Sequence, residues 1–274
     1  MQIIHGDCLE TLKEFPDDHF DLCITSPPYE AARLYGELEF KFKGQEYIDW
    51  AIARYAECYR VTKGLVAWVI EGQTRNFQWS ATPAILMADL HRRGIRLRKP
   101  PVFHRVGIPG SGGREWLRND YEFIICASKG KLPWADNTAC GSPPKYPVGG
   151  DMSYRLQDGS RRNDRTYKMR DGDEFRRKRY SEPPLCNPGN VIHCAVGGGK
   201  MGSPLAHENE APFPEKLVEF FVKSFCPPGG RIIDPFGGSG TTGAVAARLG
   251  REATLIELRA SQVEIAKRRI MGMP

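Results

Sequence analysis

A strand, a glycine-rich turn and the start of a helix follow one another in residues 231–243, RIIDPFGGSGTTG. Gly238, Gly240 and Gly243 have the spacing G-x-G-x-x-G, which lets the backbone approach a nucleotide-like ligand closely. Glu257 lies 19 residues after Gly238, at the end of the next apolar run, where its carboxylate can accept from both hydroxyls of a ribose. This order predicts a nucleotide-like ligand at a strand end. The alternative is a tight strand-to-helix turn without a ligand.

Asp234 and Pro235 stand directly before this turn. A carboxylate at this place would repel the pyrophosphate of a nicotinamide dinucleotide, whereas it would attract a cationic amino group and a sulfonium centre. S-adenosylmethionine (AdoMet) carries both of these cations. The segment therefore favours AdoMet, and a nicotinamide-dependent oxidoreductase with the same glycine pattern is the rival from another enzyme class.

A second motif, Ser26-Pro27-Pro28-Tyr29, directly follows the apolar run at residues 21–25. Two successive prolines fix φ and remove two backbone donors, so the carbonyl groups there stay free to face a substrate. The Ser26 hydroxyl, the Pro27 carbonyl and the Tyr29 ring would then meet at the carboxyl end of a strand. Taken alone, the tetrapeptide also fits a rigid strand-end turn with an incidental tyrosine.

Short apolar runs rich in β-branched residues alternate with helical patterns, which is typical of a parallel α/β sheet. A period of 3.6 predicts a helix around residues 48–59, and further helices are expected from Pro214, from Thr241 to Gly250 and over residues 261–270. Seven runs are candidate strands, namely residues 2–5, 21–25, 65–70, 101–104, 121–127, 231–234 and 253–257.

Basic residues are concentrated in residues 151–180, which hold ten Lys and Arg against six Asp and Glu. Residues 131–190 contain only four Leu, Ile or Val, too few for a core of their own. We therefore interpret residues 131–206 as a basic insertion between two halves of one domain, residues 1–130 and 207–274. The insertion is either a solvated charged loop or a segment that contacts the phosphates of a nucleic acid.

The longest apolar run, residues 65–70, is far below the roughly 20 residues that span a bilayer, and the N-terminus lacks the pattern of a signal peptide. We therefore expect a cytoplasmic protein with no membrane partner. The eight cysteines contain no C-x-x-C pair, so no metal is expected. Their one cluster with histidine is Cys186, His193 and Cys194.

With these motifs, the chain resembles the amino-group DNA methyltransferases, which modify an exocyclic nitrogen of cytosine or adenine. Residues 26–29 match the family's catalytic tetrapeptide, (D/N/S)PP(Y/F/W), and residues 234–242 match its AdoMet loop. Residues 5–8, 119–129 and 212–217 resemble further segments of the family. The order of the motifs, with the basic insertion between them, is that of the β class and resembles type II restriction-modification enzymes.

The resemblance implies an α/β fold, a doubly wound, seven-stranded mixed sheet of the Rossmann-like type, in which the strand at residues 121–127 is antiparallel. It also implies AdoMet as the cofactor and double-stranded DNA as a partner, and it leaves open a homodimer and a partner restriction endonuclease. The catalytic residues would be Ser26, Pro27, Pro28 and Tyr29. The cofactor-binding residues would be Asp7, Cys8, Ser26, Phe213, Asp234, Pro235, Phe236, Gly238, Ser239, Gly240, Thr241, Thr242, Glu257 and Leu258.

In the basic insertion, arginines are the residue type that pairs with phosphates and guanine edges. A base must leave the duplex before its amino group can react, so a DNA-contacting segment suits this chemistry. The residues that we expect to contact DNA are Arg161, Arg162, Arg165, Arg176, Arg177 and Arg179.

The exocyclic amine of a base is a poor nucleophile because its lone pair is delocalised into the ring. Acceptors that hold its N–H bonds localise the lone pair, and Ser26 Oγ and the Pro27 carbonyl are placed for this task while Tyr29 stacks on the base. A serine at the first position of the tetrapeptide resembles the cytosine-N4 enzymes of the family, so it favours cytosine N4, with adenine N6 as the alternative. A cytosine-C5 enzyme needs a nucleophilic cysteine, usually in a Pro-Cys pair, which is missing here. A non-catalytic nucleic-acid-binding module is the remaining alternative.

Overall fold

The computed structural model describes residues 1–30, 42–107, 115–144, 154–155, 158–162, 166–168, 174–176, 184–197, 204–205 and 213–271. The chain divides into two compact units. The first consists of Met1–Ala139 together with Gly189–Pro274, and the second of Cys140–Pro188. Both predicted motifs therefore lie in the first unit, and the ten Lys and Arg of residues 151–180 lie in the second.

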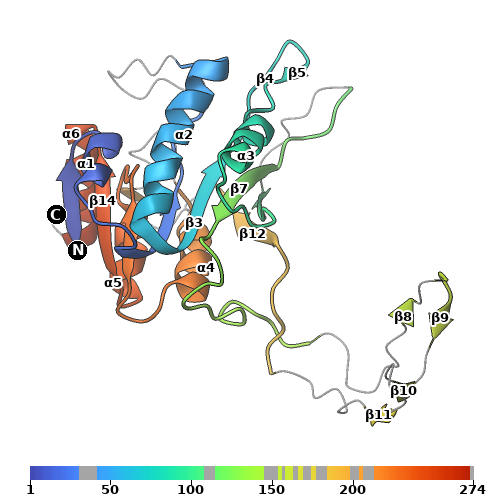
Figure 1. Ribbon diagram of the computed structural model, residues 1–274. Coiled ribbons are helices and arrows are strands. Elements are labelled where there is room, and N and C mark those ends of the chain that lie inside the picture. Colours follow the sequence, from blue (N-terminus) through green and yellow to red (C-terminus); the bar gives the residue numbers. More distant parts are fainter. Residues whose placement is uncertain are drawn as a thin grey trace. The chain divides into compact units, whose positions relative to one another are not determined.

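The first unit is built on one sheet (Figure 1), and the eight strands of this sheet lie in the order β1-β14-β13-β2-β3-β7-β6-β12. Only β7 is antiparallel to its neighbours, β3 and β6. This confirms the doubly wound mixed sheet and the antiparallel strand that the family resemblance implies. The strands are β1 (Gln2–His5), β2 (Phe20–Thr25), β3 (Thr62–Ile70), β6 (Val102–Val106), β7 (Tyr121–Ala127), β12 (Val191–Ala195), β13 (Arg231–Asp234) and β14 (Glu252–Glu257).

The expectation of seven strands is corrected by β12, the eighth. The sequence assigned its residues to the basic insertion, but β12 pairs in parallel with β6 over its whole length. Because β12 forms the edge of the sheet, its side chains alternate between exposed and buried, and only Ile192 and Cys194 are fully buried. Two buried residues in a five-residue strand give a weak apolar signal within a polar segment.

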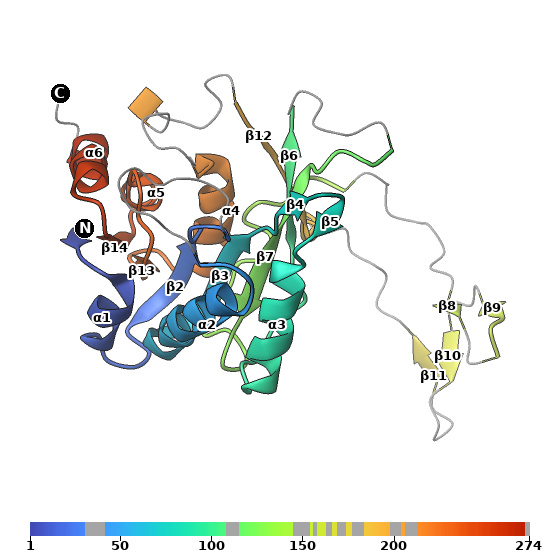
Figure 2. The same cartoon turned by 90° about the horizontal axis from the view of Figure 1, so that it is seen from above.

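Helices cover both faces of the sheet, as Figure 2 shows from above. The sequence indicated four of them and missed α1 and α3, which are short or carry scattered apolar residues. On one face lie α1 (Cys8–Lys13), α2 (Gly44–Val61) and α3 (Thr82–Arg92); on the other lie α4 (Glu215–Phe225), α5 (Thr241–Arg248) and α6 (Ala260–Met271).

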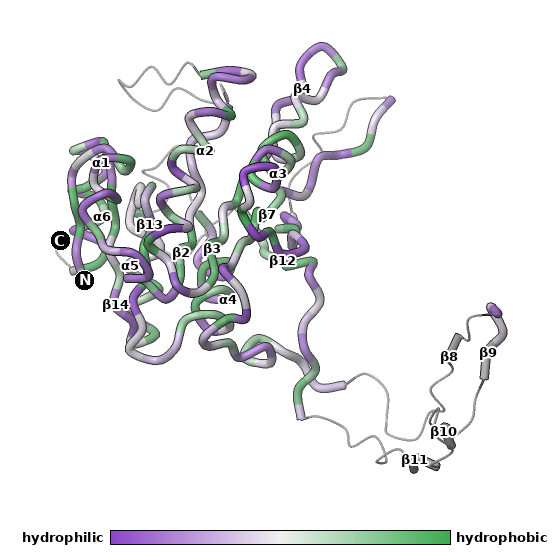
Figure 3. Tube along the Cα trace, viewed as in Figure 1, coloured by the Kyte–Doolittle hydropathy of each residue, from purple (hydrophilic) through white to green (hydrophobic). Residues whose placement is uncertain are grey.

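The core consists of two layers, one on each face of the sheet. In β3, Val66 and Trp68 pack into the layer beneath α2, whereas Ala67 and Val69 pack into the layer beneath α4. A strand that is buried on both faces needs apolar residues at every position, so β3 reads as a continuous apolar run. Hydrophobic residues, green in Figure 3, follow the central strands accordingly.

The carboxyl ends of three neighbouring parallel strands bring the predicted motifs together. Thr25 ends β2, Asp234 ends β13 and Glu257 ends β14. The strands pair in register, with Ile233 opposite Cys23. The catalytic tetrapeptide, the glycine turn and the ribose-binding candidate therefore lie along one edge of the sheet, where ligands bind in open α/β folds.

The second unit contains two short antiparallel ribbons among its described residues. They are β8 (Tyr154–Arg155) with β9 (Arg161–Arg162), and β10 (Thr166–Lys168) with β11 (Glu174–Arg176). Of the predicted DNA-binding residues, Arg161, Arg162 and Arg176 lie in these ribbons, whereas Arg165, Arg177 and Arg179 lie outside the described residues.

A third ribbon, β4 (Thr74–Arg75) with β5 (Gln78–Trp79), belongs to the first unit. It follows β3 and precedes α3. Among the residues that the structure describes, none of the helices is both long and apolar enough to cross a membrane.

Candidate active site

A hydrogen bond joins the two predicted motifs directly. Thr25, the residue before the tetrapeptide, donates through Oγ1 to Asp234 Oδ1 at 2.5 Å. Asp234 also accepts from Thr242 Oγ1 at 2.5 Å and from the backbone N–H of Phe236 at 3.1 Å. The carboxylate therefore fastens the end of β2 to both the glycine turn and the first turn of α5.

Asp234 is only 2% exposed. Burial raises the pKa of this carboxyl to about 6, although the hydrogen bonds from Thr242, Thr25 and Phe236 act in the opposite direction. The negative charge of Glu257 raises the pKa further. Contact between Asp234 and the amino group of AdoMet stays a prediction, and the structure adds a second role, that of fastening the two motifs.

The glycine turn has the backbone conformation and the close packing that the motif requires. Gly238 and Gly240 have φ values of +48° and +81°, in the left-handed region that favours glycine. A Cβ on Gly240 would lie 2.9 Å from Ala266 Cβ, and one on Gly243 would lie 2.5 Å from Ile270 Cδ1. The last two glycines thus allow α6 to pack directly against the turn and α5.

Glu257 connects the end of β14 to the glycine turn. Its Oε2 accepts from the backbone N–H of Gly238 at 2.9 Å, and its Oε1 accepts from the backbone N–H of Arg259 at 2.9 Å. The Arg259 side chain also pairs with Glu257, its Nε lying 3.5 Å from Oε1. Glu257 is thus held from the turn on one side and by Arg259 on the other, and a carboxylate oxygen has two lone pairs, so Oε2 can accept one more hydrogen bond. This arrangement suits a ribose hydroxyl placed at the turn.

Three of the predicted cofactor-binding residues turn their hydroxyl groups into the protein. Arg269 of α6 donates to Thr241 Oγ1 at 2.8 Å and to Ser239 Oγ at 3.3 Å, and its other end pairs with Glu215 at 2.7 Å. The hydroxyl of Thr242 is bound to the buried carboxylate of the turn. We therefore expect these three residues to contact a cofactor through the backbone.

The N-terminal candidates are connected to the glycine turn through α2. Asp7 caps α1, accepting from the backbone N–H of Leu9 at 2.8 Å, and pairs with Arg54 at 2.9 Å. Burial opposes the charge of Asp7, but Arg54 and the backbone donors lower its pKa overall. The guanidinium carbon of Arg54 lies 4.5 Å from the centre of the Trp50 ring. Trp50 also packs against Phe236, with the centres of the two rings 5.6 Å apart. Sequence reasoning missed Arg54 and Trp50 because neither belongs to a motif.

The remaining cofactor candidates differ in exposure. Cys8 is buried, and burial raises the pKa of its thiol to about 12. Phe213 packs against the core layer that contains α4. Leu258 is 48% exposed, and its carbonyl oxygen lies 3.0 Å from His5 Nε2. Of the three, only Leu258 offers a largely open side chain.

The catalytic tetrapeptide contains a chain of hydrogen bonds that ends at a carboxylate. Ser26 Oγ donates to Tyr29 Oη at 3.3 Å, and Tyr29 Oη donates to Glu122 Oε2 at 2.7 Å. The other oxygen of Glu122 pairs with Arg105 of β6 at 3.2 Å. Tyr47 of α2 fixes the middle of the tetrapeptide by donating to the Pro28 carbonyl at 2.8 Å.

Sequence reasoning missed Glu122, which lies 93 positions after Tyr29 in β7. A charged residue inside an otherwise apolar and aromatic strand was the available signal. The side chain is only 12% exposed, which is unusual for a glutamate unless it is paired.

The cluster of Cys186, His193 and Cys194 provides no metal site in the described part of the chain. Cys194 is buried, and His193 Nδ1 lies 2.7 Å from His104 Nδ1. Among the described residues, no three His, Cys, Asp or Glu side chains are arranged to hold a metal ion.

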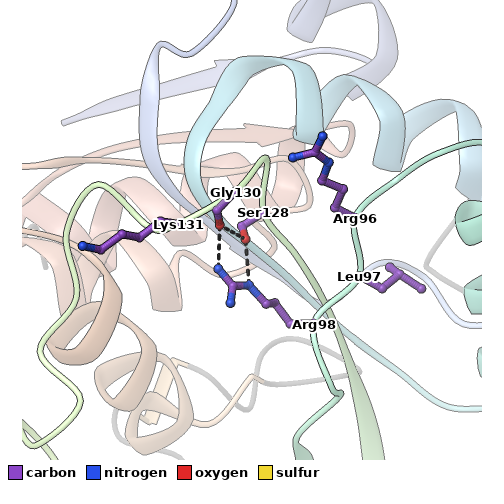
Figure 4. A pocket seen from close by; sticks show the side chains of 6 residues that line it. All are labelled: Arg96, Leu97, Arg98, Ser128, Gly130 and Lys131. Atoms are coloured by element: carbon purple, nitrogen blue, oxygen red, sulfur yellow. Dashed lines mark hydrogen bonds between the residues drawn. The ribbon is translucent and has the colours of Figure 1, made fainter. Parts of the chain in front are cut away.

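A pocket of about 420 Å³ lies away from these motifs (Figure 4). Arg98 donates across it to Ser128 Oγ at 2.8 Å and to the Gly130 carbonyl at 2.6 Å. Ser128 and Gly130 follow β7, whose last residue, Ala127, pairs with Val66 near the beginning of β3. The pocket therefore lies near the beginning of β3, whereas the tetrapeptide follows the carboxyl end of the neighbouring strand β2. Its lining residues are Arg96, Leu97, Arg98, Ser128, Gly130 and Lys131.

Comparison with known proteins agrees with this arrangement. The sequence model of the DNA methylase family N6_N4_Mtase matches residues 20–268. The DNA adenine methyltransferase YhdJ of Escherichia coli (strain K12) is 27% identical over 269 residues, which cover 98% of this chain and 82% of that protein.

Two solved structures share the fold. The cytosine-N4-specific PvuII DNA methyltransferase has a TM-score of 0.68 at 20% identity, covering 97% of this chain and 85% of that one. M1.HpyAVI in complex with SAM has a TM-score of 0.55 at 20% identity, covering 98% of each chain. The family match spans both motifs and most of the sheet, so the chain belongs to this family of DNA methylases, which act on cytosine N4 or adenine N6 with AdoMet as the methyl donor.

Proposed function

We propose that this chain is a site-specific DNA methyltransferase that transfers the methyl group of AdoMet to the exocyclic amino group of a flipped base, with cytosine N4 preferred. The observation that carries the proposal is the hydrogen bond from Thr25 to Asp234. It holds the residue before the tetrapeptide against the residue before the glycine turn. A methyl donor and an acceptor amine bound at these two places would be neighbours, as in-line transfer requires.

The cofactor would lie at the glycine turn. Glu257 would accept from the ribose hydroxyls, and the backbone of Gly238 and Gly240 would allow close approach. The carboxylates of Asp234 and Asp7 would supply the negative potential that favours a cationic amino acid and a sulfonium. AdoMet, when bound, supplies an electrophilic methyl group.

The base would lie against the tetrapeptide. Ser26 Oγ and the Pro27 carbonyl would accept the two N–H bonds of the exocyclic amine, which localises the nitrogen lone pair for attack on the methyl group. The ring of Tyr29 would stack on the flipped base and hold its amine in line. Positive charge passes from sulfur to nitrogen during the transfer, so acceptors around the amine stabilise the transition state.

The choice of base rests on Ser26. The names of the relatives include an adenine methyltransferase, YhdJ, and a cytosine-N4 methyltransferase, PvuII, so they support either base. A serine at the first position of the tetrapeptide favours cytosine N4 by resemblance to that group of the family. Adenine N6 is the second candidate.

Double-stranded DNA would be held partly by the basic insertion at residues 131–206. Its predicted contact residues include Arg161, Arg162 and Arg176, which lie in the short ribbons of the second unit. Arginine pairs with phosphate oxygens in a bidentate manner and reads guanine in the major groove. Such contacts would hold the duplex on the protein while the target base is flipped.

Mass spectrometry of nucleosides tests the function. The purified protein is incubated with double-stranded DNA and AdoMet labelled in the methyl group, and the DNA is then digested to nucleosides. We expect labelled N4-methylcytosine, and far less of it with the matched Ser26→Ala variant in the same time. Labelled N6-methyladenine would establish the second candidate, and the absence of any labelled nucleoside across DNA of varied sequence would refute the proposed function.

A further inference from the structure

We propose that Glu122 is a positioning residue for methyl transfer, because it sets the direction of the hydrogen bonds that run through Tyr29 to Ser26. The proposal rests on the proposed function, in which Ser26 Oγ accepts an N–H bond of the target amine. It assigns a role to the Tyr29 hydroxyl as well as to its ring.

The direction of the chain follows from the number of protons. Glu122, paired with Arg105 at 3.2 Å, is a carboxylate that only accepts, so the 2.7 Å bond from Tyr29 Oη to Glu122 Oε2 uses the single proton of the phenol. Tyr29 Oη then has only lone pairs left for its neighbour. The 3.3 Å bond to Ser26 Oγ must therefore use the proton of the serine hydroxyl.

This leaves Ser26 Oγ with lone pairs alone toward the base. A free serine hydroxyl can rotate and present either its proton or its lone pairs, and a proton facing the amine would oppose the contact that catalysis needs. Fixing the hydroxyl before the base arrives makes the acceptor preorganised.

Glu122 is itself held in place. Its side chain is 12% exposed, and Arg105 of the neighbouring strand β6 lies 3.2 Å from its second oxygen. Each oxygen thus has a separate partner, and the carboxylate cannot turn away from Tyr29 without giving up the arginine. Glu122 lies in β7 and Arg105 in the paired strand β6, so both belong to the sheet.

The same geometry predicts what a glutamine would do. A glutamine has one acceptor oxygen, and the guanidinium of Arg105, which can only donate, requires that oxygen. The NH₂ group would then face Tyr29 and donate to it, so the phenol proton would turn toward Ser26. The hydrogen bonds would then be donated in the opposite direction, from Tyr29 to Ser26, and the serine proton would point at the target amine.

The test is a double-mutant cycle in the single-turnover rate of methyl transfer, using Glu122→Gln, Tyr29→Phe and the combined variant. We expect Glu122→Gln to lower the rate about 10- to 100-fold in the wild-type background, with the dissociation constant for AdoMet changed by less than about twofold. In the Tyr29→Phe background, which cuts the chain, the same replacement should lower the rate by less than about threefold.

Asp120→Asn is the matched control. Asp120 is a carboxylate two positions before Glu122, it pairs with Arg118 at 3.2 Å, and it does not belong to the hydrogen bonds that run from Ser26 through Tyr29 to Glu122. The control should leave the rate unchanged. Equal losses from Glu122→Gln in both backgrounds would overturn the proposal while leaving the function intact. A wild type that transfers no methyl group would refute the function and the proposal together.

Discussion

Thr25 and Asp234 are separated by 209 positions in the sequence, yet the hydroxyl of Thr25 donates to the carboxylate of Asp234 at 2.5 Å. The contact forms because β2 and β13 are adjacent parallel strands that end at the same edge of the sheet. Its consequence is that a buried hydrogen bond joins the residue before the tetrapeptide directly to the residue before the glycine turn.

Removing this bond should destabilise the fold. Thr25→Val keeps the shape of the side chain but leaves the buried carboxylate without one donor, so we expect the free energy of unfolding to fall by about 1–3 kcal/mol. Urea denaturation measures the change. Thr25→Ser retains the hydroxyl and is the control, and a loss as large as that of Thr25→Val would show that the methyl group, not the hydrogen bond, matters.

The carboxylate of Asp234 also makes stability depend on pH. Burial raises its pKa from an ordinary value of 3.8 to about 6. The native state therefore binds a proton more readily than the unfolded state. The ionised carboxylate destabilises the fold by roughly 3 kcal/mol when the pH is well above 6, and this cost shrinks as the pH falls toward 4.

Asp234→Asn removes the titration and retains an acceptor for Thr25. Wild type should therefore lose stability relative to Asp234→Asn as the pH rises, by about 1 kcal/mol between pH 5 and pH 7.5. Urea denaturation of both proteins at the two pH values gives the difference. A difference that is the same at both values, or that changes in the other direction, would contradict the raised pKa.

The ribose assignment predicts a specific loss of affinity. Glu257→Ala should weaken AdoMet binding by about 1–3 kcal/mol, the cost of leaving buried donors without a partner. Isothermal titration calorimetry on the folded variant measures it. Glu252→Ala, at the exposed beginning of the same strand, is the control and should bind AdoMet as the wild type does. Unchanged affinity in Glu257→Ala would remove the assignment.

The basic segment predicts a dependence of DNA affinity on salt. Changing Arg176, Arg177 and Arg179 to Ala should reduce the slope of log affinity against log salt by about one for each phosphate contact removed. A variant with the same loss of charge on the first unit, at Arg92, Arg93 and Lys99, separates a local contact from net charge. If the wild type and the first variant had identical slopes and the same site preference, the three arginines would be only part of a solvated surface.

The sequence predicts most of the sheet because the buried strands are continuous apolar runs that end at turn residues. The bounds of β1, β7 and β13 are those expected from the sequence. The sequence did not predict the edge strand β12, because its side chains alternate between exposed and buried. The roles of Glu122, Arg54 and Arg269 could not be predicted for another reason, because their partners are far away in the sequence.

The central claim is that the hydroxyl of Ser26 serves the base. Ser26→Ala removes one acceptor of the target amine, and its single-turnover rate of methyl transfer and its AdoMet dissociation constant are measured side by side with those of the wild type. We predict a rate at least about 100-fold lower with an AdoMet dissociation constant within about threefold of the wild-type value. A rate close to that of the wild type, or a loss of AdoMet affinity as large as the loss of rate, would contradict the account.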